Sequence, residues 1–368
     1  MTQADILVRG AGAVGMAAAL ALSRQGLQVA LLGAPPADKA ADVRAYALNA
    51  ASVRLLVELK AWDAIPRDAR TAVHDMHVCG DADGAMLDFS AWSQGVSELA
   101  WIVDAAELEA ALRTAVNFAP HIEQVAAEVP ATLQVLAEGR DSITRRQLGI
   151  QMPRQDYGQR GIAARLLSNQ AHAGLARQWF RSPDVLALLP LDRPQPGHGY
   201  GLVWSVPDAR ADALMALDDD AFIQALNDAT AGEAGTLALA SPRAQWPLAL
   251  AHADPLHGPG WVLVGDAAHL VHPLAGQGLN LGLADVAALA GVIAERETWR
   301  SLSDARLLAR YARQRLGPTL AMARLTDGLL HLFASQQPLV KELRNRGLTL
   351  VNHLPPLKRL LTSRALGG

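Results

Sequence analysis

A glycine-rich turn near the start of the chain constrains the fold more than any other feature. Residues 10–15 read Gly-Ala-Gly-Ala-Val-Gly and stand between a short apolar run, 5–9, and an alanine-rich stretch, 16–24. This order is typical of a strand, a tight turn and a helix, and the apolar run 28–32 adds a second strand. The sequence therefore predicts a βαβ unit that begins with the first residues.

The GxGxxG spacing in this turn suits a bound dinucleotide. Gly10 permits the tight turn, Gly12 lets a pyrophosphate approach the backbone, and Gly15 lets helix and strand pack closely. The helix N-terminus would offer free N–H groups and about half a positive charge to the phosphates. The motif does not separate NAD from FAD. The predicted cofactor contacts are Gly10, Ala11, Gly12, Ala13, Val14 and Gly15.

One part of the dinucleotide pattern is absent. The acid that holds a ribose hydroxyl is expected at the end of the second strand, where this chain has Gly33. Losing a charge-assisted hydrogen bond, roughly 1.5–3 kcal/mol, would weaken binding roughly ten- to a hundredfold without abolishing it. Asp38 or Asp42 could replace the acid, and the sequence does not decide between them.

A second strand, glycine loop and helix follow late in the chain. The buried run 261–264 ends in Gly265-Asp266, and a loop with two glycines opens an apolar helix over 279–294. This predicts a second helix N-terminus directed at an anion, with the Asp266 carboxylate able to hold a sugar-like hydroxyl. Two such sites on one domain suit a long, two-part ligand.

Composition excludes several classes of protein. The 368 residues, 51% hydrophobic and 19% charged, can bury a sizeable core in two or three domains. A net charge of −3 gives no reason to expect nucleic acid as a partner. The single cysteine, Cys79, fits a reducing cytoplasm, and no residue cluster has metal-ligand spacing. We expect neither a signal peptide nor a membrane-spanning segment.

The remaining segments predict further helices and a separate sheet. Helical patterns cover 50–62 and 105–116, while 157–246 carries short strand-like pieces and one helix near 219–229. We expect the last part, 302–365, to be a run of helices broken at its prolines. These breaks fall at Pro318, Pro338 and Pro355-Pro356.

Four segments resemble a known family. Residues 265–269, Gly-Asp-Ala-Ala-His, and 273–282, Pro-Leu-Ala-Gly-Gln-Gly-Leu-Asn-Leu-Gly, closely resemble the second FAD-binding motif of the para-hydroxybenzoate hydroxylase superfamily. Residues 42–48 resemble the Asp-x-Arg segment of its ubiquinone-biosynthesis branch. Residues 138–145 resemble the superfamily's middle motif, with Glu138 where Asp is usual. The segment before this motif is shorter than in relatives, and the resemblance covers nearly the whole chain.

This resemblance implies an α/β fold with a Rossmann-like FAD-binding domain, an inserted mixed-sheet substrate domain and a C-terminal helical region. The expected FAD-binding domain is discontinuous, and a short excursion joins the substrate domain. The predicted boundaries are 1–72, 97–150 and 258–300 for the FAD-binding domain, 73–96 and 151–257 for the substrate domain, and 301–368 for the helical region.

The resemblance also implies roles for individual residues. Asp266 would hold the ribityl chain of FAD, Arg44 would lie beside the flavin, and the backbone at 276–280 would face its ring. A surface Arg44 paired with a nearby Asp is the alternative. No catalytic residue is assigned, and His269 and His272 are only weak acid-base candidates. The cofactor contacts implied by the resemblance are Arg44, Arg113, Glu138, Asp266, Pro273, Gly276, Gln277, Gly278, Leu279 and Asn280.

The implied activity is hydroxylation of a polyprenylated phenol in ubiquinone biosynthesis. NAD(P)H or another donor would reduce FAD, and O2 would be activated on the flavin as a C4a-hydroperoxide. Two alternatives stay open: hydroxylation of another aromatic compound, and a non-catalytic scaffold in a complex of biosynthetic proteins. Six basic residues against Glu342 alone after His331 favour a cytoplasmic protein peripheral to the membrane's inner face, although a solvated helix face explains them equally well.

Overall fold

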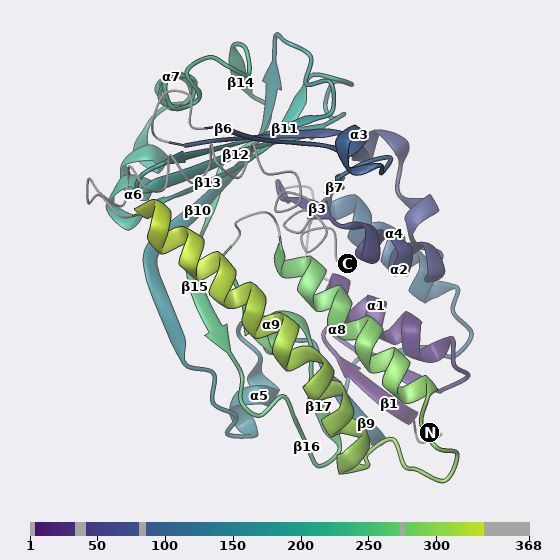
Figure 1. The fold of residues 1–368 in the computed structure, drawn as a ribbon. Helices are drawn as coiled ribbons and strands as arrows, with labels where there is room; N and C mark the ends of the chain where they lie inside the picture. The colour runs from purple at the N-terminus through teal and green to yellow at the C-terminus, as the bar shows by residue number, and fades with distance from the viewer. Residues whose placement is uncertain (1–3, 34–41, 81–85, 273–276, 335–368) are drawn as a thin grey trace.

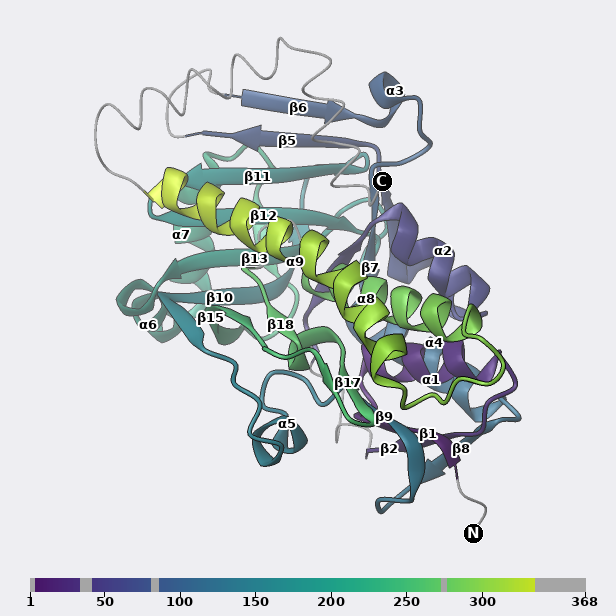
Figure 2. The same ribbon diagram turned by 60° about the horizontal axis from the view of Figure 1, so that its bottom comes forward.

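The computed structural model describes residues 4–33, 42–80, 86–272 and 277–334. These residues build a parallel sheet, a small antiparallel sheet and a large mixed sheet, with long helices packed beside the parallel sheet (Figure 1). Figure 2 shows the strands of the large sheet side by side next to the parallel sheet, with α9 (Ala305–Ala334) extending from the parallel sheet over the large sheet and α8 (Gln277–Ala294) beside the parallel sheet. The predicted α/β fold with a Rossmann-like unit and a mixed-sheet unit is confirmed.

The parallel sheet grows outward from the first strand. β1 pairs in parallel with β2 and with β9, and Ile6, Leu7 and Val8 are fully buried because helices and loops cover both faces. The predicted βαβ unit is therefore confirmed. In sheet order the strands are β16 (His257–Gly258), β17 (Trp261–Leu263), β9 (Ala131–Leu136), β1 (Ala4–Arg9), β2 (Val29–Leu32) and β8 (Ile122–Val125). The edge strand β16 pairs antiparallel with β17, and the other pairings are parallel.

Helices from distant parts of the chain pack together beside this sheet. α1 contacts both α4 and α8, and α9 packs along α8. The helices predicted from apolar patterning over 105–116 and 279–294 are confirmed as α4 and α8. The helices of this part are α1 (Ala13–Ser23), α4 (Ala105–Asn117), α5 (Ile143–Gln147), α8 (Gln277–Ala294) and α9 (Ala305–Ala334), with the 3-10 turn η3 (Gly265–Ala267).

The small sheet joins the two larger units. Its central strand β7 pairs with β3 and β4, and Asn49 caps the helix that follows β3. The elements are β3 (Ala45–Leu48), β4 (Arg70–Val73), β7 (Ala100–Asp104), α2 (Ala50–Glu58), η1 (Trp62–Ala64) and η2 (Arg67–Ala69).

The large sheet buries one face under two helices. Trp179, Tyr200 and Trp204 lie there against Phe222 of α7. Its strands in order are β18 (His269–Leu270), β15 (Ala244–His252), β10 (Arg154–Ser168), β13 (Gly199–Pro207), β12 (Asp184–Leu191), β11 (Leu175–Arg181), β5 (Asp75–Cys79) and β6 (Met86–Ser90), and β14 (Leu237–Leu239) also pairs with β10; the helices are α3 (Ala91–Gln94), α6 (Asp208–Ala216) and α7 (Asp219–Thr230).

Three expectations about elements were wrong. The helix expected over 50–62 ends at Glu58, because Lys60 adopts a left-handed conformation with φ of 61°. The strands of the middle segment are longer than expected, and β10 alone spans 15 residues. Pro318 does not break the last helix: α9 runs through it, with the proline on the exposed side. Pro338 and Pro355-Pro356 lie outside the described residues.

The division into domains stays a prediction. β18, from the segment assigned to the FAD-binding part, pairs with β15 of the large sheet. The chain after Asp266 therefore passes from one sheet to the other within four residues. Among the described residues, no helix is both long and apolar enough to cross a membrane.

Candidate functional site

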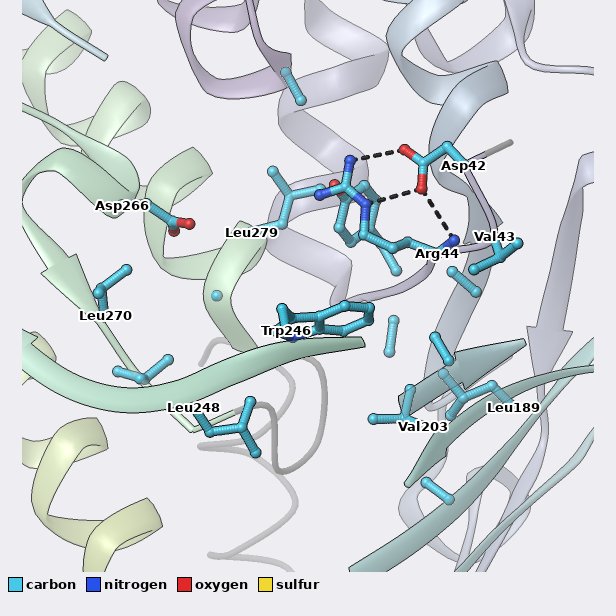
Figure 3. Close-up of a pocket in the computed structure, with 18 of the residues that line it drawn as sticks. Asp42, Val43, Arg44, Leu189, Val203, Trp246, Leu248, Asp266, Leu270 and Leu279 are labelled. Atoms are coloured by element: carbon cyan, nitrogen blue, oxygen red, sulfur yellow. Dashed lines mark hydrogen bonds and ion pairs between the residues drawn. The ribbon is translucent and has the colours of Figure 1, made fainter. Parts of the chain in front are cut away.

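A cavity of about 720 Å³ lies where the three sheets meet (Figure 3). One wall carries the glycine turn and Asp266, and the opposite wall carries small and apolar side chains of the large sheet. The volume is typical of a small-molecule site. The residues that line it include Gly12, Ala13, Val14, Asp42, Val43, Arg44, Tyr46, Glu109, Gly139, Arg140, Ala163, Ala187, Leu189, Val203, Trp246, Pro247, Leu248, Asp266, Leu270, Val271, Gly278 and Leu279.

The glycine turn has the geometry that a pyrophosphate needs. Gly10 has φ of +109°, and a Cβ there would lie 2.3 Å from the carbonyl oxygen of Ala137. A Cβ on Gly15 would lie 1.8 Å from the carbonyl oxygen of Gly10, whereas one on Gly12 would meet nothing within 4 Å. α1 begins at Ala13 without a side-chain cap. Its first N–H groups are thus available to an anion in the cavity.

Asp266 faces the cavity at the end of the parallel sheet (Figure 3). The described residues provide no hydrogen-bond partner for its carboxylate. Burial raises its pKa, against the opposing effect of the nearby charges of His269, Arg140 and Arg44. A carboxylate that faces the cavity in this way can accept hydrogen bonds from a hydroxylated ligand.

The N-terminus of α8 is fixed against the glycine turn and the small sheet. Val14 packs against Gly265 and Gly282, where a Cβ would lie 3.1 Å and 2.6 Å from its methyl groups. The side-chain oxygen of Asn280 accepts bonds from the Asn49 N–H at 3.0 Å and the Ser52 hydroxyl at 2.7 Å. The Asn280 side-chain amide donates to the Ala47 carbonyl at 2.8 Å.

The side chain of Asn280 is therefore structural. Gly278 and Leu279 line the cavity. Pro273 and Gly276 lie outside the described residues, and Gln277 is described only as the first residue of α8.

Arg44 lines the cavity and also pairs with a nearby Asp, and its position beside the flavin stays a prediction. It pairs with Asp42 through Nε–Oδ1 and Nη2–Oδ2 contacts of 2.9 and 2.7 Å (Figure 3). Its guanidinium lies 5.6 Å from the centre of the Tyr46 ring. The bond to Asp42 raises the pKa of Arg44 despite its burial. Asp42 is thus engaged by Arg44, and Asp38 lies outside the described residues.

Glu138 and Arg113 do not line the cavity. The Glu138 carboxylate accepts bonds from the Ser142 hydroxyl at 2.5 Å and from the Thr144 hydroxyl at 3.0 Å, so it fixes the turn into α5. The Glu138 side chain, longer than the usual Asp, therefore stabilises the loop, while neighbouring Gly139 and Arg140 line the cavity. Arg113 lies on α4, one turn beyond Glu109, which does line the cavity.

Neither histidine candidate reaches the cavity. His269 is buried and bonds to Asp285 through Nε2 at 2.6 Å, and Asp285 also bonds to Arg315 at 2.6 Å. His272 is buried beside Gln159, and burial lowers its pKa to about 4. An acid-base role for either residue in this cavity has no geometric support.

Arg140 and Trp246 are among the lining residues that the sequence did not reveal. Arg140 stands inside the Glu-Gly-Arg segment, but only the fold shows that it faces the cavity. Trp246 begins a Trp-Pro-Leu segment of β15, and no pattern in one sequence reveals which way its ring points.

A βαβ glycine turn, a second helix N-terminus and a cavity-facing carboxylate together define a dinucleotide-binding protein. Residues 3–112 and 93–325 match the family model described as an FAD binding domain, and the chain belongs to that family.

Individual relatives agree with this assignment. The chain is 30% identical over 390 residues to a protein of Rhodospirillum rubrum named ubiquinone hydroxylase UbiL, covering 99% of this chain and 90% of the relative. It is also 30% identical to the 3-demethoxyubiquinol 3-hydroxylase of Escherichia coli, covering 99% and 98%.

Solved structures share the fold at lower identity. PqsL, a probable FAD-dependent monooxygenase from Pseudomonas aeruginosa, has a TM-score of 0.77 at 22% identity, covering 95% of this chain and 100% of that one. HpxO of Klebsiella pneumoniae, complexed with FAD and uric acid, has a TM-score of 0.71 at 18% identity, covering 97% and 96%. The predicted cofactor FAD is confirmed, and the protein is an FAD-dependent aromatic hydroxylase.

Proposed function

We propose that the protein hydroxylates the aromatic ring of a prenylated phenol in ubiquinone biosynthesis. The observation that carries this proposal is the shared cavity: its dinucleotide wall suits FAD, and its opposite wall suits an apolar ring. The relatives named as ubiquinone hydroxylases supply the substrate class.

The residues present fit FAD. The uncapped N-terminus of α1 would bind the pyrophosphate, because its N–H groups have no side-chain acceptor. Asp266 would accept hydrogen bonds from ribityl hydroxyls. Arg44 and the backbone at Gly278 and Leu279 would lie near the ring system. When bound, FAD would supply the activation of O2, with NAD(P)H as the proposed electron donor.

The protein's own contribution would be to orient the substrate and to exclude water. Ala163, Ala187, Leu189 and Val203 come from adjacent strands of the large sheet and form an apolar floor. Such a floor holds a ring without hydrogen bonding to it and keeps solvent from the reaction.

The first experiment is the visible absorption spectrum of the purified protein with and without added FAD. We expect flavin bands at close to one FAD per chain. The loaded protein, given NAD(P)H and 2-farnesylphenol, should then form a product one oxygen heavier, detected by mass spectrometry.

The outcomes separate the alternatives. FAD binding with turnover only on untailed phenols would favour another aromatic substrate. A colourless protein that ignores added FAD would favour the scaffold function.

We also propose that the protein rests on the inner face of the membrane, where a lipid-tailed substrate resides. The support is the sequence after His331, which carries Lys341, Arg344, Arg346, Lys358, Arg359 and Arg364 against Glu342, all of them outside the described residues. Co-sedimentation with anionic vesicles that weakens as salt rises is the expected result, and its absence would overturn this proposal. Association with other biosynthetic proteins stays a prediction.

A further inference from the structure

Trp246 lies on the large-sheet wall of the cavity. In Figure 3 its indole projects between Arg44 on one side and Leu248 and Val203 on the other. Among the described lining residues, the aromatic rings are those of Tyr46 and Trp246. The guanidinium of Arg44 lies over the Tyr46 ring. The indole of Trp246 is therefore the aromatic surface still open to a ligand.

The regular pairing of β15 with β10 places Trp246 on the cavity side of the large sheet. Side chains of a regular strand alternate between faces, and Ala244, Trp246 and Leu248, two residues apart from one another, all line the cavity. The pairing is continuous from Ala163 with Ala244 to Arg160 with Pro247, and the register shifts only beyond it, between Asp156 and Arg160. The position of Trp246 in this ladder therefore directs its indole into the site.

A glycine on the neighbouring strand provides room for the indole. Gly161 pairs with Trp246 in the register of β10 and β15. A Cβ on Gly161 would lie 3.3 Å from the indole Nε1 and 3.4 Å from Leu248 Cδ2, so any larger residue would press on both side chains. The indole N–H has no hydrogen-bond partner among the described residues, which leaves a donor available to a ring hydroxyl.

We propose that Trp246 is the surface against which the aromatic ring of the substrate stacks, and that Gly161 permits the indole to take this position. The inference rests on the proposed function and deepens it: Trp246 recognises the ring of the prenylated phenol and does not recognise the tail. Offset stacking on a large aromatic face adds affinity beyond that from buried area, and it fixes the plane of the bound ring. Trp246 is thus a specificity-determining residue.

The test measures equilibrium binding to the FAD-loaded protein through the change in flavin absorption. The probes are 2-farnesylphenol, which has ring and tail, and farnesol, which has the tail alone. Trp246→Leu should weaken binding of 2-farnesylphenol about tenfold or more and leave farnesol within about twofold. Trp246→Phe keeps an aromatic face and should lose about threefold or less for the phenol.

Two further variants separate stacking from general damage to the fold. Gly161→Ala keeps the indole but displaces it, and it should weaken phenol binding by about three- to tenfold with FAD content unchanged. Trp92→Leu, on α3, removes an indole that is 93% exposed and outside the cavity, and it should bind both probes as the parent does.

The possible failures are distinguishable. If Trp246→Leu retains FAD and binds 2-farnesylphenol as tightly as the parent, the stacking inference is wrong while the proposed function stands. Equal weakening for both probes would mean a general apolar contact and would also overturn the inference. A parent that binds FAD but neither probe would refute the proposed substrate class and the inference together.

Discussion

Gly33 occupies the position where a dinucleotide-binding chain usually has its ribose acid. Its φ is +146°, a conformation that L residues rarely adopt. A Cβ there would lie 3.0 Å from the Ala11 nitrogen and 3.3 Å from its Cβ, inside the glycine turn. The backbone conformation at position 33 therefore favours glycine and disfavours any residue with a carboxylate side chain.

Introducing the acid at position 33 should therefore destabilise the folded protein. We expect Gly33→Glu to lower the free energy of unfolding by about 1–3 kcal/mol, because position 33 must leave its conformation or displace the turn. Denaturant unfolding of Gly33→Glu measures the loss of stability, and FAD titration of the same variant measures its affinity for the cofactor.

Gly33→Ala is the matched control. It should cost nearly as much stability, because the Cβ and not the charge causes the strain. Tighter FAD binding by Gly33→Glu without loss of stability would show that the turn can adjust.

A buried ionic cluster joins α8, β18 and α9 next to the turn that carries Asp266. Asp285 of α8 bonds to His269 of β18 and Arg315 of α9, and it accepts the Gly265 N–H at 2.9 Å. Burial opposes the charge on His269, but the Asp285 carboxylate outweighs it and raises the His269 pKa. Burial likewise opposes the Asp285 charge, while His269 and Arg315 lower its pKa overall. This cluster holds both ends of the turn that presents Asp266.

The pKa directions fix the pH dependence of stability. The His269 contribution is complete below the unfolded value of about 6.5 and is lost as pH rises through its raised folded-state pKa. The Asp285 contribution is present above about 3.9 and is lost as pH falls through its lowered folded-state pKa. Both contributions are therefore present between about pH 4 and 6.5.

His269→Gln should lower the free energy of unfolding by about 1.5–3 kcal/mol in that window, and the deficit should shrink at higher pH. Unfolding curves of parent and variant across pH 4–9 test this. His121→Gln, whose ring lies at the exposed end of the parallel sheet, is the control. A deficit that grows with pH would contradict the argument.

Elements with strong local patterns could be predicted from the sequence, and those set by packing could not. β1, α1 and α8 follow directly from an apolar run or a glycine turn. α9 could not be predicted, because its packing against α8 outweighs the local cost of Pro318. The placement of Asp266 at the cavity followed from its position after a buried strand. The orientation of Trp246 depends on its pairing with Gly161 of a distant strand, which sequence periodicity does not reveal.

At the scale of the whole molecule, a buried arginine connects the large sheet to the small one. Arg165 of β10 donates through Nη2 to the Arg44 carbonyl at 2.6 Å and to Asp104 Oδ2 at 2.9 Å. Asp104 also caps α4. Burial lowers the pKa of Arg165, although Asp104 opposes this effect. One side chain thus fixes the backbone of Arg44, which lines the cavity.

Arg165→Met should lower the free energy of unfolding by about 1.5–3 kcal/mol and weaken FAD binding, because the Arg44 carbonyl and Asp104 lose a charged donor. Arg165→Lys, which can still donate one bond, should recover part of both losses. Arg160→Met, on the same strand but in contact with exposed Asp208 and Asp212, serves as the control. FAD affinity unchanged in Arg165→Met would mean that Arg44 needs no such anchor.

The walls of the cavity come from segments as far apart in the chain as Gly12 and Leu279. During synthesis, the glycine turn emerges from the ribosome early, but Asp266 and the N-terminus of α8, which complete the same side of the cavity, follow only late in the chain. FAD would therefore be captured only late in folding. Its binding free energy would then be added to the stability of the completed chain and to no earlier intermediate.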